Sequence, residues 1–195
     1  QPTVALINNA QREHQEFMRN VTEVAAEHAA LVGALPAGGT AVLNADDPGV
    51  EVWRAAARAR AGVRVIEFAL GHPAAIHLRG AYAPADGRIA FATPAGDATA
   101  RLAAPGRHNV SNALAAAAAA LAVGLPLAAV VRGLEAFRPV AGRLVALRSG
   151  TGATVLDDTY NANPDSVRVA IDVLAAAAPP RWLVLGDMGE VGASG

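Results

Sequence analysis

Short apolar runs alternate along the chain with segments of helical periodicity. The runs at 3–7, 40–43 and 64–70 are rich in Val, Leu, Ile and Ala, which is typical of buried strands. Between the first two runs, apolar positions recur at helical spacing over 21–35. Strands that alternate with helices in this way predict an α/β fold with a mostly parallel sheet.

The pattern changes between residues 75 and 103. Short segments of alternating apolar and polar residues are separated there by turn sequences such as Asp86-Gly87. We expect these segments, at 76–78, 88–91 and 99–102, to form antiparallel strands at one edge of the sheet.

Two further helices are predicted near 110–123 and 127–137. Strands are predicted at 144–147 and 153–156, with a Gly-rich stretch between them that favours a domain boundary. Beyond it, the turn at 157–164, a helix reaching Ala178 and a strand at 182–185 predict the opening of a second βαβ unit. The predicted domains are therefore 1–147 and 148–195.

The first strand starts with no preceding turn or cap, and the second βαβ unit has only begun when the sequence stops. We therefore expect both ends to be cuts within a longer protein.

Composition narrows the possible functions. All 16 basic residues are Arg, and 17 acidic residues bring the net charge to −1, which argues against a nucleic-acid or anionic membrane surface. The absence of Cys excludes disulfides and thiolate catalysis and fits a reducing compartment. The absence of Lys excludes a P-loop and a Schiff-base Lys within these residues. The longest apolar run, at 113–123, is too short to span a bilayer.

Polar clusters follow the predicted strands, where open α/β sheets bind ligands. In the first, His14 follows two Asn residues, which suits either a surface position or a weak oxygen-and-imidazole metal site. In the second, Asp47 can cap a helix that Pro48 begins. Asp46 is then left to accept hydrogen bonds from a ribose or to hold water around Mg²⁺.

Two further clusters lie later in the chain. Asn109 and Asn112 are three residues apart at a helix start, so paired carboxamides could face adenine, or Asn109 could be a simple N-cap. The segment 155–166 holds two adjacent carboxylates, a Tyr and two Asn, which exceeds what capping requires. Arg143 could reach a phosphate between the domains, or be an exposed solubilising residue.

Together these clusters resemble the Mur ligases, and within that family the members that add D-alanyl-D-alanine to UDP-N-acetylmuramoyl-tripeptide. The resemblance covers nearly the whole chain in the family's order, and 157–166 is its most specific part. The matching segments are Asn8 to His14, Asn44 to Asp47, Pro105 to Asn112, Asp157 to Ser166 and Leu185 to Glu190.

The resemblance implies the later part of a central ATPase domain, followed by the start of a C-terminal Rossmann-like domain. It also implies an ATP- and Mg²⁺-dependent ligase that works through an acyl phosphate, with its phosphate-binding loop upstream, so that this chain alone would be inactive. His14 would bind Mg²⁺, and the nucleotide would contact His108, Asn109 and Asn112. Arg143 and Asp158 would grip ATP and act in catalysis. The side where the dipeptide enters would be lined by Tyr160, Asn161, Asn163 and Ser166.

The chain departs from the family where a carbamylated Lys usually holds Mg²⁺. His28 takes that place and Ala30 replaces a nearby acid, so we expect His28 to pack or to hydrogen-bond. The alternatives are a related ligase such as folylpolyglutamate synthase, or a non-catalytic nucleotide-binding or interaction module. We further expect a cytoplasmic monomer with no nucleic-acid or membrane partner.

Overall fold

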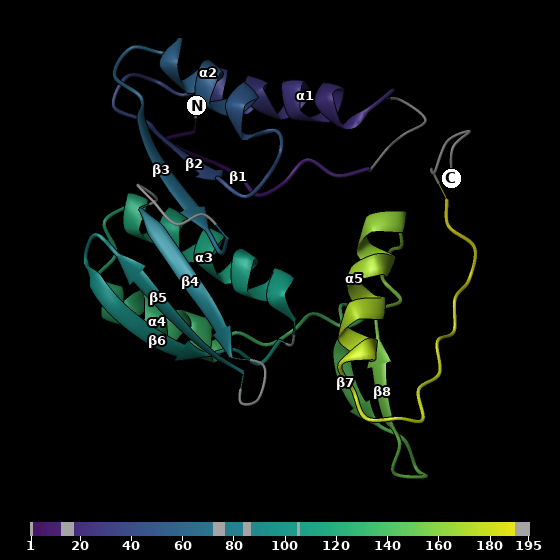
Figure 1. Cartoon of the computed structure of the whole chain (residues 1–195). Helices are drawn as coiled ribbons and strands as arrows, with labels where there is room; N and C mark the ends of the chain where they lie inside the picture. The colour runs from purple at the N-terminus through teal and green to yellow at the C-terminus, as the bar shows by residue number, and fades with distance from the viewer. Residues whose placement is uncertain (1, 13–17, 72–76, 84–86, 105, 190–195) are drawn as a thin grey trace.

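The computed structural model describes residues 2–12, 18–71, 77–83, 87–104 and 106–189. Its first lobe is built on a single six-stranded sheet with the spatial order β1-β2-β3-β4-β5-β6 (Figure 1). The first four strands pair in parallel and the last three pair antiparallel, so the expected antiparallel edge is present. Its first strand was expected at 76–78, but residue 76 lies outside the described residues and the strand runs from Leu78 to Ala83. The strands are β1 Val4–Ile7, β2 Thr40–Asn44, β3 Arg64–Ala69, β4 Leu78–Ala83, β5 Arg88–Thr93 and β6 Gly96–Arg101.

Helices cover both faces of the parallel part of this sheet. Helices α1 (Val21–Gly33) and α2 (Val50–Arg58) pack on one face, and α3 (Arg107–Ala122) packs on the other. Helix α4 (Leu127–Ala136) lies on the same side as α3 but packs against β6 of the antiparallel part. All five residues of β2 are buried, because Val42 faces the α3 side while Ala41 and Leu43 face the α1 side. Burial on both faces explains why this strand is a continuous apolar run rather than an alternating one.

Two predicted helix starts are wrong. Helix α3 begins at Arg107, with Gly106 as its N-cap at φ +98°, so Asn109 lies inside the first turn and is not an N-cap. Helix α2 begins at Val50 rather than Pro48. The Asp47 carboxylate instead accepts hydrogen bonds from Ala10 N at 2.9 Å and Gly49 N at 2.7 Å, and so ties the end of β1 to the start of α2.

The second lobe contains an antiparallel hairpin and a helix. Strands β7 (Val145–Arg148) and β8 (Thr154–Asp157) pair with each other, and α5 spans Pro164–Ala175. Residues 149–152, where a domain boundary was expected, form the hairpin turn, with Ser149 N bonded to Ala153 O at 2.9 Å. The predicted division after residue 147 falls inside β7 and stays a prediction.

The strand predicted at 182–185 is wrong. The structure assigns these residues no strand, and Trp182 and Val184 are 84% and 91% exposed. An apolar run forms a strand only where a neighbour satisfies its backbone groups, and none of the described residues pairs with it. Within the described part of the chain, no helix combines the length and hydropathy needed to cross a membrane.

A candidate nucleotide and peptide site between the lobes

The carboxyl ends of β1 and β2 meet the first turns of α3 through a series of side-chain amides. Asn44 Nδ2 donates to Asn8 O at 2.8 Å, and Asn8 Nδ2 donates to Asn112 Oδ1 at 2.8 Å. Asn112 Nδ2 then approaches Asn109 Oδ1 at 3.4 Å. Three of the predicted clusters are therefore brought together at one edge of the sheet.

These contacts limit how Asn109 and Asn112 could read a base. Both polar atoms of the Asn112 carboxamide already bond within the protein, so an adenine edge would have to use their remaining hydrogen-bonding capacity. Asn8 Oδ1 is buried with no partner among the described residues. The assignment of Asn109 and Asn112 to adenine stays a prediction.

Asp46 joins the second cluster to the end of β3. Its carboxylate accepts hydrogen bonds from Leu70 N and from Gly71 N, the latter at 3.1 Å. A Cβ at Gly71 would lie 3.1 Å from Asp46 Oδ1, so the loop approaches this carboxylate closely. Asp46 thus orders the loop after β3, where the sequence suggested a ribose or metal ligand.

The chain enters the second lobe in an uncommon backbone conformation. Among the described residues, Leu144 is the one non-glycine residue with a positive φ, at +52°, and its N–H donates to Asp158 Oδ1 at 3.1 Å. Two residues earlier in the turn, Gly142 has φ +75° and its carbonyl accepts from Tyr160 N at 3.0 Å. Left-handed conformations cost energy for a bulky residue, so Asp158 helps to hold a strained turn beside Arg143.

Arg143 lies over the ring of Tyr160. Its guanidinium carbon is 4.0 Å from the ring centroid, within the range of a cation–π interaction. Both residues are exposed. The predicted phosphate-binding Arg and the predicted peptide-side Tyr therefore contact each other directly.

His108 lies at the first turn of α3, where this helix faces the second lobe. A Cβ at Gly106 would be 2.6 Å from the His108 ring and 3.1 Å from Val173 of α5, so only glycine fits between them. Burial lowers the pKa of His108 below its ordinary value, and the charge of Asp158 opposes this to a smaller extent. The lowered pKa favours the neutral form of the His108 imidazole.

The remaining predicted residues shape the start of α5. Asn163 Oδ1 accepts from Ser166 N at 2.8 Å, and Ser166 Oγ accepts from Asn163 N at 3.0 Å, which is a reciprocal capping box. Asn161 Oδ1 accepts from Ala162 N at 2.9 Å. These bonds hold the turn in one shape, and the substrate contacts of these residues stay a prediction.

The described residues do not form a metal centre. His14 lies outside the described residues, and the described part of the chain holds no group of three His, Asp or Glu side chains suited to a metal. His28 is half-buried on α1, and its Nδ1 is buried with no described hydrogen-bond partner. These residues do not by themselves fit a Mg²⁺ site.

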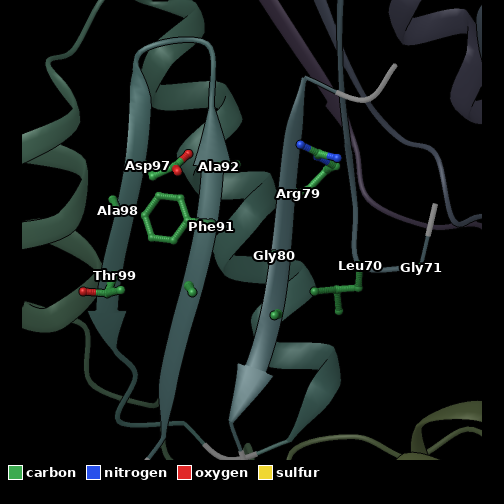
Figure 2. Close-up of a pocket in the computed structure, with 11 residues that line it drawn as sticks. Leu70, Gly71, Arg79, Gly80, Phe91, Ala92, Asp97, Ala98 and Thr99 are labelled. Carbon is green, nitrogen blue, oxygen red and sulfur yellow. The ribbon is translucent and has the colours of Figure 1, made fainter. Parts of the chain in front are cut away.

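A shallow hollow of about 680 Å³ lies elsewhere, on the face of β4, β5 and β6 that faces away from α3 (Figure 2). The residues that line it include the small side chains of Ala81, Ala90 and Ala92 and the charged residues Arg79 and Asp97. None of the predicted site residues lines it.

Sequence reasoning missed three residues of the lobe junction. Asn8 and Arg12 lie in the first polar cluster but gave no signal of their own, since their partners Asn112 and Asp165 are far along the chain. The positive φ of Leu144 could not be predicted, because Leu rarely adopts this conformation.

Known proteins match this chain along almost its whole length. Residues 1–120 match the Mur ligase middle domain, and residues 142–194 match the Mur ligase, glutamate ligase domain. The UDP-N-acetylmuramoyl-tripeptide--D-alanyl-D-alanine ligase of Escherichia coli is 35% identical over 193 residues, which are 98% of this chain and 42% of that protein. The enzyme of the same name from Mycobacterium bovis is 36% identical over 98% of this chain and 38% of that protein.

Solved structures agree with these matches. A crystal structure of MurF from Acinetobacter baumannii superposes with a TM-score of 0.90 at 31% identity, covering 100% of this chain and 42% of that one. MurF from Thermotoga maritima in complex with ADP shares the fold, with a TM-score of 0.81 at 22% identity over 98% of this chain and 43% of that one. The chain thus spans about two fifths of the length of its relatives. Since a domain description of this family matches more than half of its residues, the chain belongs to the Mur ligase family.

Proposed function

We propose that the full-length protein carrying this chain is an ATP-dependent amide ligase that joins D-alanyl-D-alanine to UDP-N-acetylmuramoyl-tripeptide. The observation that carries the proposal is the meeting of three separate polar segments at the lobe junction. Asn109 and Asn112 lie at the edge of the first lobe, and His108 lies near Asp158. Arg143 contacts Tyr160 at the entrance to the second lobe. The relatives named for this reaction match the chain across all of these segments.

The reaction has two steps. In the first, a carboxylate oxygen of the tripeptide attacks the γ-phosphorus of ATP, ADP leaves, and an acyl phosphate forms. In the second, the amine of the dipeptide attacks the acyl carbon, inorganic phosphate leaves, and the nitrogen loses a proton as the amide forms. Negative charge gathers between the reacting groups, and positioned cations offset it.

We assign roles on chemical grounds. Arg143 offers a fixed planar cation suited to phosphate oxygens, and Asp158 orders the turn that carries it. The amides of Asn109 and Asn112 suit a base edge. His108 lies near Asp158 at the start of the same helix, and we assign it a nucleotide contact as well. Tyr160, Asn161, Asn163 and Ser166 form the turn on the side where the dipeptide would enter.

The remaining expectations are proposals as well. Mg²⁺ would neutralise the triphosphate when bound, and His14 is the residue proposed to hold it. The lack of Cys is compatible with a cytoplasmic location. We also propose a monomer that binds neither nucleic acid nor membranes.

Purified full-length protein should be assayed for ADP release with the nucleotide-linked tripeptide and each of three acceptors. We expect ADP release that depends on both the tripeptide and D-alanyl-D-alanine, with the amide product found by mass spectrometry. Turnover with glutamate or diaminopimelate in place of the dipeptide would contradict the assignment and favour a related ligase. ATP binding without turnover of any acceptor would favour a non-catalytic module.

A further inference from the structure

Arg12 and Asp165 form an ion pair between the two lobes, although 153 residues separate them in sequence. Arg12 Nη2 lies 2.6 Å from Asp165 Oδ1, and Arg12 Nε lies 3.2 Å from each carboxylate oxygen. The backbone N–H of Arg12 also donates to Asp165 Oδ2 at 3.1 Å. The Asp165 carboxylate is therefore bonded to the main chain of the first lobe as well as to the flexible Arg12 side chain.

Both residues lie where the lobes face the candidate site. Arg12 follows the carboxyl end of β1, beyond Asn8 of the amide series. Asp165 belongs to the first turn of α5, whose start is fixed by the capping box between Asn163 and Ser166. In Figure 1 the segment after β1 passes beside this end of α5. The Asp165 carboxylate, held by the capped start of α5, thus binds Arg12 at the edge of the sheet where the proposed nucleotide contacts lie.

The electrostatics agree with this geometry. The hydrogen bond and charge of Arg12 hold the pKa of Asp165 below its ordinary value, with a smaller contribution from Arg168. The side chains of the pair are 43% and 24% exposed. A single exposed ion pair usually adds little to stability, so its main effect would be on geometry.

We propose that Arg12 and Asp165 are a positioning pair that sets the separation of the lobes, and so holds the turn at Tyr160–Asn163 opposite Asn109 and Asn112. The pair touches no reacting atom. It acts by keeping the dipeptide side of the site aligned with the nucleotide side, and its kinetic consequence rests on the proposed ligase function. Without the pair, the lobes sample a wider range of separations and the dipeptide meets an aligned site less often.

The first test measures lobe separation without turnover. Spin labels on Cys residues introduced at Ala59 and Ala177, which are exposed positions in the two lobes, report their distance distribution in the full-length protein by pulsed electron resonance. We expect Arg12→Ala and Asp165→Ala to broaden or shift the distribution. The matched control Arg19→Ala removes an ion pair to Glu23 within the first lobe and should leave the distribution unchanged. Distributions for Arg12→Ala and Asp165→Ala that coincide with the parent would overturn the proposal.

The second test uses kinetics and a double-mutant cycle. Each single variant should raise the KM for the dipeptide roughly three- to tenfold. The double variant should be no worse than Asp165→Ala, because Asp165→Ala already removes both the side-chain ion pair and the bond from the Arg12 backbone N–H. The exchanged pair Arg12→Asp with Asp165→Arg should recover part of the loss. Independent, multiplying effects of the two substitutions would overturn the proposal. Since the distance measurement needs no activity, a failure of the ligase assignment is distinguishable from a failure of the positioning role.

Discussion

Asp158 accepts a hydrogen bond from the backbone of Leu144, the residue whose positive φ carries the chain into the second lobe. The carboxylate thereby stabilises a backbone conformation that Leu seldom adopts, directly after Arg143. Asp158, which is predicted to act on ATP, thus also has a structural role. Substitutions at Asp158 can separate the two roles.

Asp158→Ala removes the acceptor, whereas Asp158→Asn keeps an oxygen for Leu144 N and loses only the charge. We expect Asp158→Ala to lower the free energy of unfolding by about 1 kcal/mol, the usual net worth of one such bond. Asp158→Asn should cost less than half of that in urea unfolding. Both variants should lose ligase turnover. Full activity in Asp158→Asn would contradict a role for its charge.

Arg143→Gln should lower kcat/KM for ATP by at least about tenfold, because one charge-assisted hydrogen bond is worth about 1.5–3 kcal/mol. The melting temperature should change little, since Arg143 is exposed. Arg148→Gln is a suitable control, as Arg148 is also exposed and bonds only to the hairpin carbonyl of Gly152 in the described contacts. If the two variants have equal steady-state kinetics, Arg143 does not contribute to ATP binding or catalysis.

Asn8→Ala should weaken binding of a non-hydrolysable ATP analogue because it releases Asn112 from its fixed orientation. We expect a loss of roughly two- to tenfold by calorimetry, smaller than that of Asn112→Ala, from one hydrogen bond of about 0.5–1.5 kcal/mol. Asn8→Asp should be worse than Asn8→Ala, since it places a carboxylate against Asn112 Oδ1. Unaltered affinity in all three variants would show that the amide series does not contact the nucleotide.

Gly80→Ala should destabilise the first lobe. A Cβ at Gly80 of β4 would lie 2.9 Å and 3.1 Å from the two methyl groups of Leu114 on α3. Overpacking of this kind costs about 1–3 kcal/mol, measurable by urea unfolding. Gly133→Ala is the matched control, because a Cβ there meets no atom within 4 Å in helix α4 and should add about 0.5–1 kcal/mol of stability.

The lowered pKa of His108 gives stability a pH dependence. Below its ordinary pKa of 6.5 the unfolded chain binds a proton that the folded site resists, so the free energy of unfolding should fall as pH drops through 6.5. The fall should level off below the pKa of the folded state. His108→Asn should lack this part of the slope in urea unfolding from about pH 8 to pH 5. Parallel profiles for the variant and the parent would refute the lowered pKa of His108.

Sequence patterns predict most of the first lobe, because its strands are buried apolar runs and its helices have one apolar face. The errors share a cause in tertiary context. The apolar run at 182–185 has no described pairing partner, and Gly106 starts α3 through a positive φ that residue type alone does not reveal. The pairing of Arg12 with Asp165 depends on how two lobes meet. The amides of Asn109 and Asn112 were predictable as a pair, but the hydrogen bond from Asn8 to Asn112 was not.

In the proposed reaction, both lobes act on one tripeptide carboxylate, which passes through an acyl phosphate. The most direct measurement uses tripeptide substrate with heavy oxygen in its terminal carboxylate and follows the label in the inorganic phosphate released by the full-length protein. We predict one labelled oxygen in each phosphate, formed only when D-alanyl-D-alanine is present and in step with amide product. Unlabelled phosphate would mean that ATP is hydrolysed by water, and would contradict the acyl-phosphate mechanism.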